Sequence, residues 1–238
     1  MFFSATEHQN LLLLRFCAPD SGNAMSLAVA RELASLRKRH SRWKGVVAVQ
    51  SGHPTLFCSG GNLSDYKKMK GRAPGLKVNR EITRCLDTFA AWPVVKVALV
   101  EGDVLGGGLE WLARFDFRWS TPYALFSFWQ KRIGLSPGWG GGRAWTAKLG
   151  EERVRALLLE ARLLSADRAL SIGLVDRLID SQRMQVELAD FTSGLASVEA
   201  GGSTEKLLRW STKREVETFN SLWLGPEHKR ALTRWKPK

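Results

Sequence analysis

Three consecutive glycines followed closely by a glutamate are the first residues in this sequence that could do chemistry. The glycines occupy positions 106–108 and follow an apolar, β-branched run at residues 94–100, which predicts a buried strand. Residues 109–114 have a helical composition. Glycines let a ligand approach the backbone, and the first free N–H groups of a helix point into such a turn. The turn could hold a developing oxyanion, and Glu110 could move a proton beside a carbonyl group.

Another glycine turn, at residues 60–61, makes this interpretation more specific. In chain order it is the first turn, and the turn at residues 106–108 is the second. Glycine triplets also occur in ordinary tight turns, and the helix dipole alone favours a glutamate in a first turn. However, Gly60 and Gly61 also follow a short apolar run and precede an expected helix that carries Tyr66 and several lysines. Two such turns could each direct one backbone N–H at the same oxygen, so we expect them to meet.

The elements around these turns predict an α/β fold. Strands are expected at residues 2–6, 10–16 and 43–50, and a helix follows Ser26, where apolar residues recur at helical spacing. After residue 180 the character changes to helices at 182–195, 204–219 and 226–235, with a linker at 197–203 and Thr204 as a helix cap. The chain therefore combines an alternating strand and helix region with a helical tail.

The bulk composition limits the class of protein. A length of 238 residues with 44% apolar content suffices for one large domain, or for one domain with an appendage. No apolar run approaches the roughly 18 residues needed to cross a bilayer, and the first residues lack the pattern of a signal peptide. Cys17, Cys58 and Cys85 have no metal-binding spacing, which is typical of free thiols in a reducing compartment. We expect a cytoplasmic protein with no metal and no membrane partner.

The formal net charge of +13 suits an anionic partner. Nucleic acid, a membrane surface and a phosphate-bearing small molecule all meet this description. The charges are scattered along the chain, so a generally basic surface explains them equally well.

Five motifs, in order between about residues 10 and 180, resemble those of the crotonase superfamily, also called the enoyl-CoA hydratase/isomerase family. They are NAMS, FCSGGNL, PVVKVALVEGDVLGGGLEWLARFDFRWST, IGLSPGWGGGRAWTAKLG and LLSADRALSIGLVDRLID. The resemblance implies a spiral of ββα repeats over residues 1–180. It also implies a helical C-terminal region, residues 181–238, that assembles homotrimers or hexamers and helps to close the acyl pocket. The aromatic residues that fit a buried contact face there are Trp210, Phe219, Trp223 and Trp235.

The resemblance also implies a site for a coenzyme A thioester. The two backbone amides that polarise the thioester oxygen map onto Gly61 and Gly107. The backbone contacts to CoA map onto Ala24, Ser59, Gly60 and Gly61. Asn62 stands where the family has aspartate, an exchange that leaves the turn possible. No other cofactor is implied, because CoA enters as part of the substrate.

Basic residues after the first turn are candidates to neutralise the phosphates of CoA. This inference comes from charge alone and concerns Lys67, Lys68, Lys70 and Arg72. Each of them would suit a solvated helix face at least as well.

The reaction follows from two positions. Hydratases of the family use two glutamates; the first maps onto Glu110, but the second maps onto Gln130, which cannot take a proton near neutral pH. This loss disfavours hydration and double-bond isomerisation but leaves enolate stabilisation intact. The chain resembles the branch that decarboxylates ethylmalonyl-CoA and methylmalonyl-CoA, although that branch carries histidine at the position of Gln130. We expect Glu110 to deliver a proton and Gln130 to orient the substrate carboxylate or a water.

Three alternatives stay open. The protein could be an enoyl-CoA hydratase/isomerase, or a catalytically silent acyl-CoA binder, as Asn62 and Gln130 would suggest. It could also be an RNA-binding homologue, as the net charge and the basic residues between 67 and 77 would suggest. No RNA-binding motif supports the last alternative.

Asp103 stands three residues before the glycine triplet, where the family usually has a neutral residue. It could be a substituted catalytic carboxylate or the cap of the helix after Gly106. We favour the cap, because aspartate is a preferred N-cap residue.

Overall fold

Two mostly parallel sheets form the frame of the protein in a computed structural model that describes residues 1–197, 215–222, 226 and 229–230. The six-stranded sheet has the order β1 (Phe3–His8), β2 (Leu11–Phe16), β3 (Val46–Ser51), β5 (Lys96–Val100), β7 (Phe117–Ser120) and β9 (Arg177–Leu178). The three-stranded sheet has the order β4 (Leu56–Cys58), β6 (Asp103–Leu105) and β8 (Phe126–Ser127). In these sheets β1 pairs antiparallel to β2, and every other neighbouring pair is parallel.

The chain winds as a spiral of ββα repeats. After the β1–β2 hairpin and α1, three successive turns each give one strand to each sheet before they enter a helix. Thus β3 and β4 lead to α2 (Leu63–Lys67) and α3 (Arg72–Ala90), β5 and β6 lead to α4 (Gly107–Leu112), and β7 and β8 lead to the 3-10 helix η2 (Trp129–Ile133) and α5 (Gly141–Leu149). The expected α/β fold with ββα repeats is confirmed.

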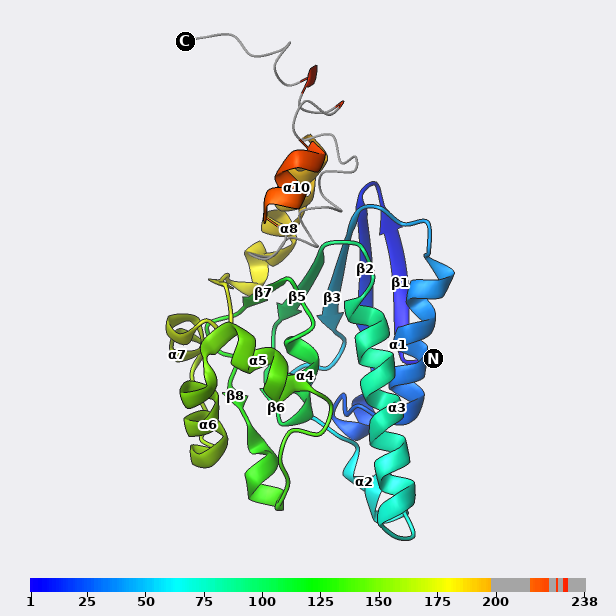
Figure 1. Cartoon of the computed structure of the whole chain (residues 1–238), viewed down its shortest axis with the longest axis vertical. Coiled ribbons are helices and arrows are strands. Elements are labelled where there is room, and N and C mark those ends of the chain that lie inside the picture. Colours follow the sequence, from blue (N-terminus) through cyan, green and yellow to red (C-terminus); the bar gives the residue numbers. More distant parts are fainter. Residues whose placement is uncertain (198–214, 223–225, 227–228, 231–238) are drawn as a thin grey trace.

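The structure describes further helices besides these. They are η1 (Pro19–Ser21), α1 (Leu27–Arg39), α6 (Glu151–Glu160), α7 (Ala166–Ile172), α8 (Ser181–Ser197) and α10 (Glu215–Leu222). Ser26 caps α1, because its hydroxyl oxygen accepts the N–H of Val29 at 3.1 Å. Helices α1 and α3 run side by side along one flank (Figure 1).

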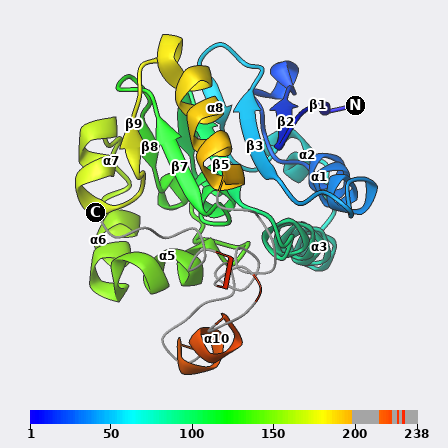
Figure 2. The same ribbon diagram turned by 90° about the horizontal axis from the view of Figure 1, so that it is seen from above.

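The central strands β3 and β5 of the six-stranded sheet are buried on both faces, which explains why they are almost continuously apolar. Val47 and Val49 of β3 point into the main core with the residues of α1 and α3. Val46 and Ala48, on the opposite face, pack in a second cluster with Met184 and Leu188 of α8. Figure 2 shows α8 lying across this face of the sheet.

The structure differs from the expected elements chiefly around the second glycine turn. The apolar run at residues 94–100 does not lead directly into the glycines, since β6 intervenes and belongs to the other sheet. Helix α4 begins at Gly107, and β3 begins at Val46 rather than at residue 43. The expected helix at 182–195 lies within α8.

Much of the expected tail lies outside the described residues. This applies to Thr204, to residues 198–203 of the linker, to most of the 226–235 helix, and to the side chains of the four aromatic residues of the tail. The boundary at residue 180 and the role of residues 181–238 in assembly and pocket closure stay predictions. None of the helices in the described part of the chain is long and apolar enough to span a membrane.

Candidate active site

The two glycine turns lie in contact with each other. Strands β4 and β6 are parallel neighbours, so the turns that follow them emerge at the same edge of the small sheet. A methyl carbon placed on Gly60 would lie 3.0 Å from the carbonyl oxygen of Leu105 and 3.1 Å from the nitrogen of Gly107. Gly60 has a φ of +104° and Gly106 a φ of +50°, conformations that favour glycine. The structure therefore brings together two segments that are more than forty residues apart in the sequence.

The N–H groups of Gly61 and Gly107 are available to a ligand. Gly107 is the first residue of α4, and its N–H has no partner within the helix. Gly61 lies opposite Met25, but the hydrogen bonds of that bridge use Gly60 and Asn62 instead. Within the described ranges, no hydrogen bond is found for either of these two N–H groups.

Both turns open into a cleft of about 840 Å³. Nearly all of the residues predicted for the site line it, namely Ala24, Ser59, Gly60, Gly61, Lys68, Gly107, Glu110 and Gln130. Lys67 does not line the cleft; it is exposed in the last turn of α2. Lys70 and Arg72 are also exposed and do not line it. Their contribution to phosphate binding stays a prediction.

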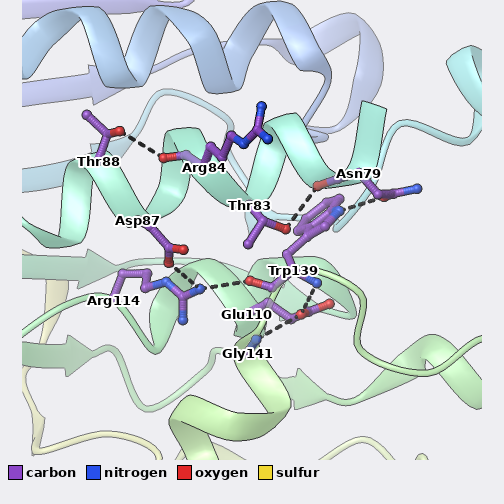
Figure 3. Close-up of polar contacts among 9 residues, drawn as sticks. All are labelled: Asn79, Thr83, Arg84, Asp87, Thr88, Glu110, Arg114, Trp139 and Gly141. Carbon is purple, nitrogen blue, oxygen red and sulfur yellow. Dashed lines mark hydrogen bonds and ion pairs between the residues drawn. The ribbon is translucent and has the colours of Figure 1, made fainter. Parts of the chain in front are cut away.

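Glu110 is buried, with 2% of its surface exposed, and its carboxylate is fully engaged. It accepts the backbone N–H groups of Gly138 at 3.1 Å, Trp139 at 2.7 Å and Gly141 at 3.0 Å. A longer contact of 3.4 Å comes from Nε2 of Gln130. Together these four donors use the acceptor positions that a carboxylate offers. Glu110 therefore holds the turn at residues 138–141 (Figure 3), and its expected role in proton delivery stays a prediction.

The side-chain amide of Gln130 makes one long hydrogen bond, through its nitrogen, and leaves its oxygen without a partner among the described residues. The residue is 6% exposed, and its Oε1 is buried with no partner in the part of the chain that the structure describes. Because the Glu110 carboxylate accepts hydrogen bonds, the amide nitrogen of Gln130 must face it. An unpaired buried acceptor is costly, so Oε1 offers a place for a donor from a ligand or a water.

Trp139 is held at three points beside the second turn. Besides its N–H to Glu110, its carbonyl accepts from Arg114 at 2.7 Å, and Arg114 also pairs with Asp87 at 2.9 Å (Figure 3). Its indole N–H donates to Oδ1 of Asn79 at 2.7 Å. The ring lies so close to Gly107 that a methyl group on this glycine would overlap it. The ring therefore forms a fixed wall of the cleft next to the Gly107 amide.

The geometry of two glycine turns opening into one cleft agrees with a sequence comparison. The family described as enoyl-CoA hydratase/isomerase matches residues 6–201. The chain belongs to this family. It is thus an acyl-CoA enzyme of the crotonase superfamily.

The sequence relatives that match this chain are ethylmalonyl-CoA decarboxylases, and a solved structure of an enoyl-CoA hydratase shares its fold. The chain is 30% identical over 235 residues to an ethylmalonyl-CoA decarboxylase from Danio rerio, covering 92% of this chain and 78% of that protein. It is 28% identical over 242 residues to one from Gallus gallus, covering 96% and 81%. An enoyl-CoA hydratase from Mycobacterium smegmatis superposes with a TM-score of 0.87 at 18% identity, covering 100% of this chain and 98% of that one. At this identity the superposition shows the fold alone.

Asp103 is a strand residue and not the helix cap that we favoured. Its Oδ1 accepts the N–H of Leu125 at 2.9 Å, and it does not line the cleft. Helix α4 is preceded by Gly106 and has no side-chain cap, so the predicted cap is wrong. The reason is that Asp103 is part of β6, where its carboxylate ties that strand to the segment before β8.

Sequence reasoning missed Asn79 and Arg114, and it gave no role to Tyr66 or Trp139. The PGWGGG motif was visible, but nothing in it indicated that its tryptophan lies against Gly107. The partners Asn79 and Trp139 are 60 residues apart. No local pattern in the sequence indicates that these two side chains form a hydrogen bond.

The reactivity of Cys58, at the end of β4, tests whether the residues just before the turn at 60–61 are buried. Burial raises the pKa of its thiol to about 12 and also raises the pKa of Cys85, whereas Cys17 is exposed. The thiolate is the reactive form, so a pKa of about 12 leaves roughly one Cys58 in 10⁴ reactive at about pH 8. We expect a thiol reagent at this pH to modify Cys17 promptly and Cys58 only after denaturation, as measured by peptide mass mapping. Equal rates at Cys17 and Cys58 in the native protein would contradict the described packing.

Proposed function

We propose that this enzyme decarboxylates a malonyl-type CoA thioester, ethylmalonyl-CoA or methylmalonyl-CoA. The single observation that carries the proposal is the pair of unpartnered N–H groups, on Gly61 and Gly107, at two turns that touch within one cleft. Two converging donors form an oxyanion hole for the thioester oxygen. The named relatives at 28% and 30% identity support the choice of substrate.

The proposed reaction needs little beyond these two donors. The bond between the α-carbon and the substrate carboxylate breaks, carbon dioxide leaves, and the electron pair moves into the thioester to give an enolate. The N–H groups of Gly61 and Gly107 stabilise the negative charge on its oxygen. The α-carbon then takes up a proton, and the enolate returns to a thioester.

The groups near the two amides favour this reaction over hydration. Hydration needs a carboxylate that is free to activate water, but Gln130 is an amide and Glu110 is occupied by N–H donors. Decarboxylation requires no such base. We assign the final proton to a water, which becomes hydroxide. Oε1 of Gln130 would hold this water, because Gln130 lines the cleft and its Oε1 has no partner among the described residues.

The CoA part of the substrate is proposed to follow the cleft along Ala24, Ser59 and Gly60, with Lys68 near its phosphates. No further cofactor takes part in this proposal. A homotrimer or hexamer remains the expected assembly.

The proposal is tested by supplying the protein with ethylmalonyl-, methylmalonyl- and crotonyl-CoA separately. Release of labelled carbon dioxide and loss of the enoyl absorbance are followed in parallel. We expect carbon dioxide from the first two compounds and no hydration of the third. Hydration without decarboxylation would overturn the proposal, and tight binding of acyl-CoA without any turnover would identify a silent binder instead.

A further inference from the structure

One asparagine side chain joins two aromatic residues of the cleft. Oδ1 of Asn79, on α3, accepts the hydroxyl of Tyr66 at 2.9 Å and the indole N–H of Trp139 at 2.7 Å. All three residues line the cleft. Tyr66 comes from α2, whereas Trp139 comes from the turn before α5, so Asn79 joins two segments that are far apart in the sequence.

The orientation of the Asn79 amide is fixed. Its Nδ2 donates to the carbonyl of Gly75, one helical turn earlier, at 2.9 Å. Oδ1 must therefore face the two rings, and the indole nitrogen of Trp139 can act only as a donor. Burial and the negative charge of Glu110 raise the pKa of Tyr66 to about 12, so its hydroxyl stays protonated and keeps donating near neutral pH.

The two rings held by Asn79 each lie against one of the two glycine amides. A methyl carbon placed on Gly61 would lie 3.0 Å from the Tyr66 hydroxyl oxygen and 3.1 Å from the edge of its ring. On the other side, the Trp139 ring leaves no room for a methyl group on Gly107. The space beside the two N–H groups is thus bounded by two rings that share one acceptor atom.

We propose that Asn79 is a positioning residue that sets the width of the acyl pocket, and hence which α-substituent fits beside the thioester. This inference rests on the proposed function, since it takes the thioester to sit at the Gly61 and Gly107 amides. In this scheme Asn79 contacts neither the thioester oxygen nor the α-carbon. It acts through Tyr66 and Trp139, because losing the shared acceptor releases both rings at once.

The test measures binding of two unreactive compounds by calorimetry, CoA and butyryl-CoA. Wild-type protein is expected to bind butyryl-CoA more tightly than CoA. Asn79→Leu removes the acceptor and leaves two donors unpaired, so we expect butyryl-CoA to bind roughly tenfold more weakly while CoA binding is unchanged. The matched control is Thr83→Val, one turn further along α3, whose hydroxyl donates to the backbone of Asn79 and which does not line the cleft. It should change neither affinity.

Two more variants keep the inference testable if Asn79→Leu does not fold. Asn79→Asp keeps an acceptor for both rings and should retain most of the acyl preference. Tyr66→Phe removes one of the two bonds and should weaken butyryl-CoA binding selectively, with no further loss when it is combined with Asn79→Leu. An unchanged acyl preference in Asn79→Leu and Tyr66→Phe, or an equal loss for CoA and butyryl-CoA, would overturn the inference alone. Wild-type protein that binds neither compound would overturn the proposed function as well.

Discussion

Replacing Gly60 with alanine is expected to lower the rate of decarboxylation by about 10²–10³-fold, the typical cost of losing one oxyanion donor. The methyl group would press on the carbonyl of Leu105 and on the nitrogen of Gly107, at 3.0 and 3.1 Å, and both are backbone atoms with little room to move. It would thus act as a wedge between the two turns. Steady-state release of carbon dioxide from ethylmalonyl-CoA measures the effect.

The matched control for this variant is Gly71→Ala. Gly71 has a φ of +93°, close to the +104° of Gly60, but a methyl group there would meet nothing within 4 Å. Both variants therefore carry a similar backbone strain, of about 1–3 kcal/mol, and only Gly60→Ala separates the turns. We expect Gly71→Ala to lose stability but to keep its turnover. Equal loss of turnover in the two variants would show that strain, and not the wedge, is responsible.

Replacing Glu110 with glutamine is expected to lower the free energy of unfolding by about 2–4 kcal/mol, since hydrogen bonds to a buried charged group are worth roughly 1.5–3 kcal/mol each. The carboxylate accepts from the backbone of Gly138, Trp139 and Gly141, and the amide nitrogen of glutamine would face N–H donors. The turn would loosen and the Trp139 ring would leave Gly107. Thermal denaturation and turnover are measured on the same preparation.

Two outcomes separate an anchoring role of Glu110 from a chemical one. If Glu110 anchors the turn, stability and turnover fall together, whereas Glu152→Gln, an exposed change in the first turn of α6, leaves both nearly unchanged. If Glu110→Gln is as stable as the wild type but inactive, Glu110 transfers a proton, and the structural role assigned to it is wrong.

The sequence was sufficient to predict the frame of the site, because that frame depends on local patterns. The glycines at 60–61 and 106–108 each stand between an apolar run and a helix, and this order alone predicted two turns whose N–H groups meet at one oxygen. Strand β6 was not predicted, because three residues are too few to show the alternation of apolar and polar residues that marks a strand. Asp103 was therefore interpreted as a helix cap.

The contacts that tune the site could not be predicted, since they join residues distant in the sequence. Arg114 reaches the carbonyl of Trp139, 25 residues away, and Asn79 reaches its indole across 60 residues. The anchoring contacts of Glu110 escaped prediction for the same reason. The sequence shows that Glu110 follows the glycines closely. It does not show that the turn at residues 138–141, whose N–H groups bind the carboxylate, packs against Glu110 in the folded chain.

A crystal structure of the protein with butyryl-CoA, the product expected from ethylmalonyl-CoA, tests the central claim most directly. We predict that the thioester oxygen lies within about 2.7–3.2 Å of the nitrogens of both Gly61 and Gly107, the range of ordinary N–H···O hydrogen bonds. A bound thioester whose oxygen contacts neither nitrogen, or only one of them, would contradict the claim.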